Sequence, residues 1–106
     1  MFARTVSFSL KPGRAVEFRQ LLDQSVIPVL WKQKGFQDEI SLVTASGAEG
    51  IGISVWDLKE NAETYGRGAY SDVLRLLEPV IEGTPLVQTY EVSHSTLHKV
   101  PARVTA

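Results

Sequence analysis

The sequence contains no cysteine, no long apolar run and no excess of basic residues. Without cysteine, disulfides, thiolate metal sites and cysteine nucleophiles are all excluded. No apolar stretch approaches the roughly 20 residues that a membrane-spanning helix needs. Residues 1 to 10 alternate polar and apolar side chains and include Arg4, which is not the pattern of a signal peptide. A cytoplasmic protein without a membrane segment is the default expectation.

The charge balance argues against a nucleic-acid partner. Eleven basic residues stand against twelve acidic ones, and no basic stripe is present of the kind that nucleic-acid binders carry. The length of 106 residues is enough for one domain with its own core. We expect that domain to span residues 1–95, with a C-terminal tail over residues 96–106 that contacts the partner subunit.

The spacing of apolar residues changes from strand-like to helical twice along the chain. Alternation over residues 2–10 predicts a strand, and Gly35 ends a helix from about residue 14 that Pro28 must kink. Strands follow over residues 36–45 and 51–56. Asp57 and Glu60 predict a capping box that opens a second helix. Glycines at 66 and 68 divide that helix, and the last strand covers residues 86–95.

The order of elements is therefore β-α-β-β-α-β. Right-handed crossovers then predict a ferredoxin-like α+β fold, with a four-stranded antiparallel sheet in the order 4-1-3-2 and both helices on one face. The second face of the sheet has two solutions. It can pair with the sheet of another copy, or it can stay solvated, as antiparallel sheets tolerate.

Several segments resemble the antibiotic biosynthesis monooxygenase domain family. They are Gly35-Phe36 after the kinked helix, Val55-Trp56 at a strand end, the Asp57–Glu60 helix start, and Pro79 before the stretch 82–87. The resemblance covers residues 1 to 92 and implies a dimeric α+β barrel, which is a homodimer with two facing sheets. It also implies cofactor-free oxygenation of a small aromatic or quinol ligand, and the sequence carries no flavin or metal motif.

The resemblance transfers Trp56 to the pocket position of the polyketide-tailoring branch. Other residues of the characterised branches differ here. The Asn four residues before this Trp is Gly52, and the Tyr six residues after it is Ala62. The Trp of the haem-degrading branch aligns with Tyr65, and its haem-ligating His falls near residues 77 and 78, which are Leu and Glu. Haem degradation is therefore not expected.

Aromatic residues form one group of pocket candidates. Trp56 can stack on a flat ligand or simply fill the core at the end of its strand. Tyr65 and Tyr70 can donate to a phenolate or quinone oxygen, or can anchor packing with their hydroxyls at the rim. The glycine break between them can loosen a lid. Trp31, after the Pro28 kink, can close the cavity from the helix side or lie at the rim of the core.

The charged candidates are Arg4 and two histidines. Arg4 interrupts an apolar strand face, where it can neutralise an anionic substrate or pair with an acidic residue such as Glu91. His94 and His98 are candidate general bases. They lack a third metal ligand, so no metal is expected. The alternative is that their segment extends across a partner subunit.

Two functions remain open. One is a cofactor-independent monooxygenase, in which the substrate itself reduces oxygen while the protein binds it, deprotonates it and excludes water. The other is a non-catalytic dimeric module that binds a small ligand or has a structural role. A cavity filled by its own side chains would favour the second.

Overall fold

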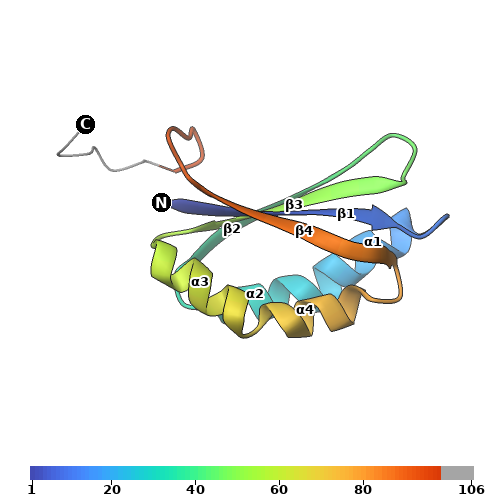
Figure 1. The fold of residues 1–106 in the computed structure, drawn as a ribbon, viewed down its shortest axis with the longest axis horizontal. Helices are drawn as coiled ribbons and strands as arrows, with labels where there is room; N and C mark the ends of the chain where they lie inside the picture. Colours follow the sequence, from blue (N-terminus) through green and yellow to red (C-terminus); the bar gives the residue numbers. More distant parts are fainter. Residues whose placement is uncertain (99–106) are drawn as a thin grey trace.

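The fold is a four-stranded antiparallel sheet with all helices on one face (Figure 1). The structure is a computed structural model that describes residues 1–98. The strand order is β2-β3-β1-β4, which confirms the predicted ferredoxin-like α+β architecture and its crossovers. The strands are β1 (Phe2–Leu10), β2 (Phe36–Val43), β3 (Glu49–Trp56) and β4 (Ile81–Glu91).

The first crossover passes through a widened helical turn where the sequence predicted a kink. It comprises α1 (Ala15–Leu21), the π-helical turn η1 (Leu22–Val26) and α2 (Ile27–Trp31). Pro28 lies in the first turn of α2, where its missing N–H costs least. A π turn inserts an extra residue into the helix ladder, so the proline ring does not meet the carbonyl four residues earlier.

The second crossover is broken into two helices, as predicted. They are α3 (Lys59–Arg67) and α4 (Tyr70–Leu77). Gly66 stays inside α3, so the break falls after it. The predicted capping box does not form. Leu58 is the N-cap, which places Glu60 one position too early to reach back, and Asp57 instead accepts hydrogen bonds from the Leu58 N–H and the Asn61 side chain.

The last strand begins and ends earlier than the sequence predicted. It starts at Ile81, which pairs with Leu10, because the Gly- and Pro-containing stretch after it joins the ladder instead of forming a loop. The pairing register shifts between Ser7 and Ser9, and Gly83 has a φ of +73°. A bulge therefore absorbs the residues that looked like a terminator.

The core lies between the sheet and the helices. Phe8 packs on Phe18 with ring centroids 4.9 Å apart. Gly50 lies across from Phe8 on β3, and a Cβ there would come within 2.6 Å of the Phe8 ring. Glycine at this position therefore lets an aromatic ring lie against the neighbouring strand. The largest fully buried side chains are Trp56, Phe18 and Val80.

The opposite face of the sheet carries exposed apolar side chains. The register places them next to one another, with Leu42 beside Ile51 and both Ile51 and Leu86 beside Ser7. Their neighbours Ile40 and Tyr90 are also exposed. No helix covers this face in the part of the chain that the structure describes (Figure 1). This face is more apolar than the small polar residues of β1 alone indicate.

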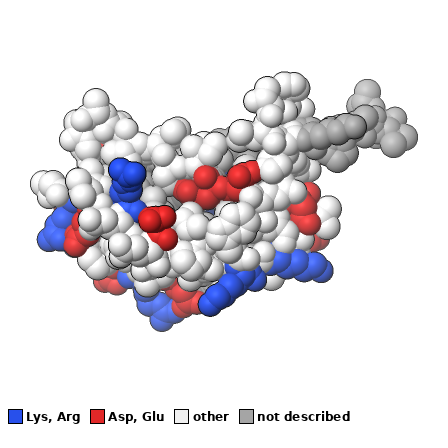
Figure 2. Space-filling model, turned by 180° about the vertical axis from the view of Figure 1, so that it is seen from behind, with Lys and Arg blue, Asp and Glu red and all other residues white. Residues whose placement is uncertain are grey.

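The remaining surface is mixed in charge. On the face shown in Figure 2, the Lys and Arg side chains of residues 1–98 are interspersed with Asp and Glu side chains. Among these residues, no helix has the length and apolar character needed to cross a membrane.

Candidate functional site

A small cavity lies between the helix-covered face of the sheet and the helices. Its volume is about 60 Å³, enough for a few water molecules but far below the several hundred Å³ typical of ligand pockets. One end is apolar, with Phe8, Phe18, Val26 and Leu77 among its walls. The other end is polar. Its side chains are Arg4, Glu39, Ser41, Ser54, Tyr65 and Tyr70.

Arg4 occupies the polar end. Its side chain is on the helix face of β1, and the residue is only 6% exposed. The guanidinium carbon lies 4.0 Å from the ring centroid of Tyr70 and 5.2 Å from that of Tyr65. Cation–π contacts of this kind stabilise a desolvated cation. Among residues 1–98, no acidic side chain forms an ion pair with Arg4.

The two tyrosines come from either side of the helix break. Tyr65 on α3 is buried, and Tyr70 on α4 packs edge-on against it with centroids 5.9 Å apart. Burial raises the pKa of Tyr65 well above its usual value, although the nearby Arg4 charge opposes this shift. Burial also raises the pKa of Tyr70, against the lowering effect of the Arg4 charge. Both phenols are therefore protonated donors at neutral pH.

Trp56 supports this cluster from below and does not line the cavity. It is completely buried, and its indole stacks on Tyr65 with centroids 5.0 Å apart. Its N–H donates to Ser54 Oγ, 2.9 Å away. Trp56 also contacts Phe36, which in turn packs against Trp31. Trp31 is 63% exposed and lies away from the cavity, on the surface of α2.

Gly52 creates much of the space at the centre of the site. It lies on the helix face of β3, between Val6 of β1 and Ser41 of β2. A Cβ built on Gly52 would meet no atom within 4 Å. The missing side chain therefore leaves the hollow that the neighbouring strands border.

Glu39 and Ser41 form the third wall of the polar end, and the sequence analysis did not select either. Glu39 lies beside Ser54 in the sheet and accepts a hydrogen bond from the Ser41 hydroxyl. Burial raises the pKa of Glu39, and the Ser41 hydrogen bond partly offsets this.

The strand pattern of β2 on its own does not indicate these residues. The register shifts between Phe36 and Asp38, and this shift decides which side chains of β2 face the helices. As a result, Ile40 and Leu42 point to the open face and the polar residues Glu39 and Ser41 point to the core. An apolar pattern alone would have chosen the reverse.

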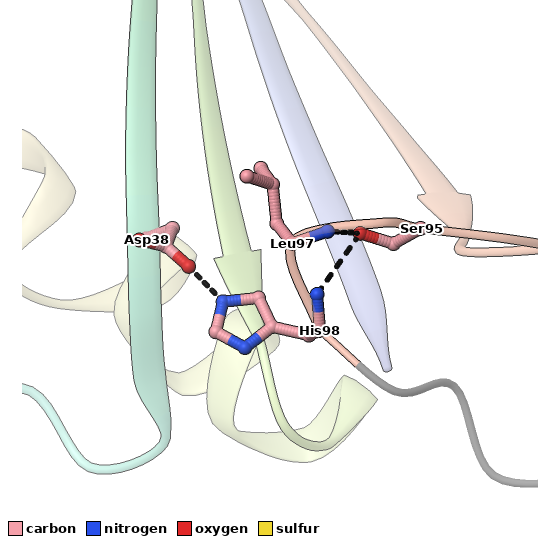
Figure 3. Close-up of polar contacts among 4 residues, drawn as sticks. All are labelled: Asp38, Ser95, Leu97 and His98. Atoms are coloured by element: carbon pink, nitrogen blue, oxygen red, sulfur yellow. Dashed lines mark hydrogen bonds and ion pairs between the residues drawn. The ribbon is translucent and has the colours of Figure 1, made fainter.

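Neither histidine lines the cavity. His94 is exposed in the segment after β4. His98 contacts the carboxylate of Asp38 on β2, and Ser95 Oγ accepts hydrogen bonds from the N–H groups of Leu97 and His98 (Figure 3). This segment is therefore fastened to its own sheet. The rest of the predicted partner-contacting tail, residues 99–106, lies outside the described residues.

No metal site forms among the described residues 1–98. No three side chains of His, Asp or Glu come close enough together there to hold an ion. The predicted site residues thus separate into two groups. Arg4, Tyr65 and Tyr70 meet at the cavity with Trp56 behind them, whereas Trp31 and His94 lie elsewhere.

Comparison with known proteins places the fold. No protein-family model and no curated protein matches the sequence. Among solved structures, a putative antibiotic biosynthesis monooxygenase from Bordetella bronchiseptica superposes with a TM-score of 0.74 at 14% identity, covering 88% of this chain and 97% of that one. A monooxygenase from Streptomyces coelicolor, in complex with the ligand nanaomycin D, gives 0.71 at 18% identity, covering 95% and 92%.

A third similar structure is SnoaB, a cofactor-independent oxygenase from Streptomyces nogalater. It gives a TM-score of 0.71 at 13% identity, covering 92% of this chain and 97% of that one. Other similar structures include a Nitrosomonas europaea protein of unknown function, so the shared fold does not by itself indicate one activity. These TM-scores confirm the family resemblance at the level of the fold. This chain has the fold of the antibiotic biosynthesis monooxygenases.

Proposed function

We propose that this protein is a cofactor-independent monooxygenase that oxidises a small hydroxylated aromatic, such as a quinol or hydroxyarene, in the cavity under the sheet. The carrying observation is the cavity's polar end, where a buried guanidinium and two protonated phenols face a cavity whose other end is apolar. Apolar walls hold a flat ring, and few polar groups orient it. The shared fold with oxygenases adds support by analogy.

The reaction needs no external electron donor. A hydroxyarene with a free para C–H can become a para-quinone, with one oxygen atom of O₂ inserted and the other released as water. The substrate supplies all four electrons. Loss of the phenolic proton enriches the ring in electrons, and a buried cation such as Arg4 stabilises the resulting anion. The protein's part is to bind, to favour the deprotonated form and to exclude water.

Oxygen consumption tests this proposal. Purified protein would be mixed with a panel of quinols, naphthols and anthrone-type substrates in an oxygen-electrode cell. We expect turnover of at least one compound, and Arg4→Met should reduce that turnover about tenfold or more, because a charge-assisted contact is lost. Arg67→Met on the exposed side of α3 is the matched control. Rates equal to buffer across the panel would contradict the proposal.

We also propose that the protein forms a homodimer in which the open sheet face packs against that of a second copy. The exposed apolar side chains there form a patch on β2, β3 and β4, with Ser7 of β1 between Ile51 and Leu86: Ile40, Leu42, Ile51, Leu86 and Tyr90. Burying such a patch is favourable by about 25 cal/mol per Å², and a two-fold axis would pair the patch with itself. Light scattering should give the mass of a dimer. Leu42→Glu together with Leu86→Glu should give a folded monomer.

A non-catalytic module is the second candidate, and the cavity volume favours it. About 60 Å³ does not admit an aromatic ring without movement of side chains, since Arg4 and the two tyrosines fill the polar end. In that case the protein would show neither oxygen consumption nor saturable binding of phenols. Measurable binding without turnover would instead indicate a ligand-binding protein.

A further inference from the structure

Two groups of opposite charge line the same cavity without touching. The register puts Glu39 beside Ser54, and Ser54 beside Arg4, in one row across β2, β3 and β1 on the helix face. Two strand spacings separate their backbones by roughly 10 Å. Among residues 1–98, neither group forms an ion pair within the row. Ser54, whose hydroxyl accepts a hydrogen bond from the Trp56 N–H, lies between them.

This separation is unusual for a buried guanidinium with a partly buried carboxylate nearby. Burying an unpaired guanidinium is costly, and a carboxylate in the same cavity would be its natural partner. Arg4 instead contacts the faces of Tyr70 and Tyr65, and its interaction with the Tyr70 hydroxyl lowers the pKa of that phenol, against the effect of burial. The N–H groups of a guanidinium suit an oxyanion, which neither aromatic face supplies. An anionic ligand would therefore complete the site.

Glu39, in contrast to Arg4, would be stabilised by gaining a proton. Burial makes its ionised form unfavourable, so the carboxylate is a stronger base than an exposed one. The Ser41 hydroxyl holds it at the polar end of the cavity. The ionisable groups that face this space are Arg4 from β1, Tyr65 from α3 and Tyr70 from α4. Of the four groups, Glu39 is the only carboxyl group and so the one whose ionised form can accept a proton, since Arg4 is a cation and the two tyrosines are protonated phenols.

We propose that Glu39 and Arg4 act together on one hydroxyl group of a bound hydroxyarene, Glu39 as the proton acceptor and Arg4 as the binding partner of the phenolate. The O–H bond of the ligand breaks, its proton goes to the Glu39 carboxylate, and the negative charge moves to the ligand oxygen beside Arg4. No electron leaves the ligand in this step. The inference rests on the proposed function only in taking the ligand to be a hydroxyarene.

The space fits this arrangement at one end of the ligand. The cavity beside these groups is large enough for the oxygen atom and the adjacent ring carbons, and Gly52 leaves its centre open. The rest of the ring requires side chains to move. Leu22 and Leu74, partly exposed lining residues on η1 and α4, are the ones positioned to do so. The adjoining π turn and the α3–α4 break are the irregular segments nearest to them.

Binding of para-nitrophenol tests the proposal, because its neutral and ionised forms absorb at different wavelengths and its nitro group makes it resistant to oxidation. The full chain would be titrated at a pH below the probe's own pKa. We expect the bound probe to absorb as phenolate. An infrared difference spectrum recorded on binding should show a new protonated carboxyl C=O band.

Each variant should remove one of these signals. Glu39→Gln should abolish the carboxyl band while the bound probe still absorbs as phenolate. Arg4→Met should weaken binding about tenfold or more and return the bound probe to its neutral form. The matched controls Glu60→Gln and Arg67→Met, both exposed on α3, should behave like the unmodified protein. Gly52→Val should block binding while keeping the fold.

Three results would overturn the inference. They are no saturable binding, binding of the neutral phenol to the unmodified protein, and a carboxyl band that persists in Glu39→Gln. The probe is not an oxygenase substrate, so the two proposals fail separately. Phenolate binding without oxygen uptake from any quinol would refute the monooxygenase and leave the acid–base assignment standing. Oxygen uptake that falls in Arg4→Met but is unchanged in Glu39→Gln would refute the assignment of Glu39 as the proton acceptor and leave the monooxygenase standing.

Discussion

The indole N–H of Trp56 donates to the hydroxyl of Ser54, two residues earlier on the same strand, at 2.9 Å. This bond holds the polar edge of the ring against Ser54, a side chain at the polar end of the cavity. The flat face of the ring is then left to stack on Tyr65. Trp56 therefore positions a cavity residue, and Tyr65 is the aromatic side chain that a ligand would meet.

Replacing Trp56 should reduce stability in two distinguishable steps. Trp56→Phe removes the hydrogen bond and part of the volume and should cost about 1–3 kcal/mol. Trp56→Ala should cost about 3–5 kcal/mol, because a fully buried ring leaves a cavity. Urea unfolding followed by circular dichroism measures both. Trp31→Phe, on the exposed indole, is the control and should change stability by less than about 0.5 kcal/mol.

Gly52→Val should fill the cavity without harming the fold. A Cβ there meets no atom within 4 Å, and valine is favoured in strands. We expect unchanged or slightly raised stability together with loss of phenol binding, measured by thermal unfolding and by titration. Strong destabilisation would show that the space at Gly52 is needed for packing and is not a binding cavity.

Glu39→Gln should stabilise the protein at neutral pH but not at acid pH. Because burial raises the folded-state pKa of Glu39 above its ordinary value of 4.5, the native state holds the proton more tightly than the unfolded chain. Its contribution is therefore fully present below pH 4.5 and is lost as the pH rises through the folded pKa. Paired melting curves of both proteins across this range give the difference. A difference that does not vary with pH would contradict the burial of this carboxylate.

Two glycine variants should have opposite signs. Gly66→Ala in α3 should gain about 0.5–1 kcal/mol, because a Cβ there makes only ordinary contact with Arg4 at 3.5 Å and alanine favours the helix. Gly35→Ala should lose at least about 1 kcal/mol. Its φ is +82°, and a Cβ would fall 2.1 Å from Asp57 Oδ1. Denaturant midpoints of the two variants measure the contrast, and equal shifts would refute it.

The sheet could be predicted because its signals are local. Alternation from Phe2 to Leu10 defines a strand, and crossover handedness then fixes the order of the four strands. The ends of elements were less predictable. The residues from Glu82 to Pro85 have turn-like chemistry, but β1 offers them a ladder, and a bulge costs less than leaving it unpaired.

The site depended on cross-strand information that one sequence does not display. Arg4, Tyr65 and Tyr70 could be selected because each is conspicuous within its own segment. Glu39 could not be selected, because a register shift at the start of β2 turns its side chain toward the helices and pairing with Ser54 of β3 places it at the cavity. In the sequence, Gly52 was notable only because the related family has Asn at this position. In the fold, its missing side chain leaves the centre of the cavity open.

The unequal burial of the two tryptophans has an optical consequence. Trp56 is sealed from water and Trp31 is mostly in it, so they should emit at shorter and longer wavelengths respectively. Iodide in solution reaches only the outer one, and its quenching therefore separates the two emissions. Trp56 stacks on the cavity residue Tyr65, whereas Trp31 does not contact the cavity. The emission that iodide does not quench should therefore change when a ligand enters and shifts Tyr65. The emission of Trp56 thus serves as an intrinsic probe of ligand binding, and the emission of Trp31, 63% exposed on α2, serves as the internal reference.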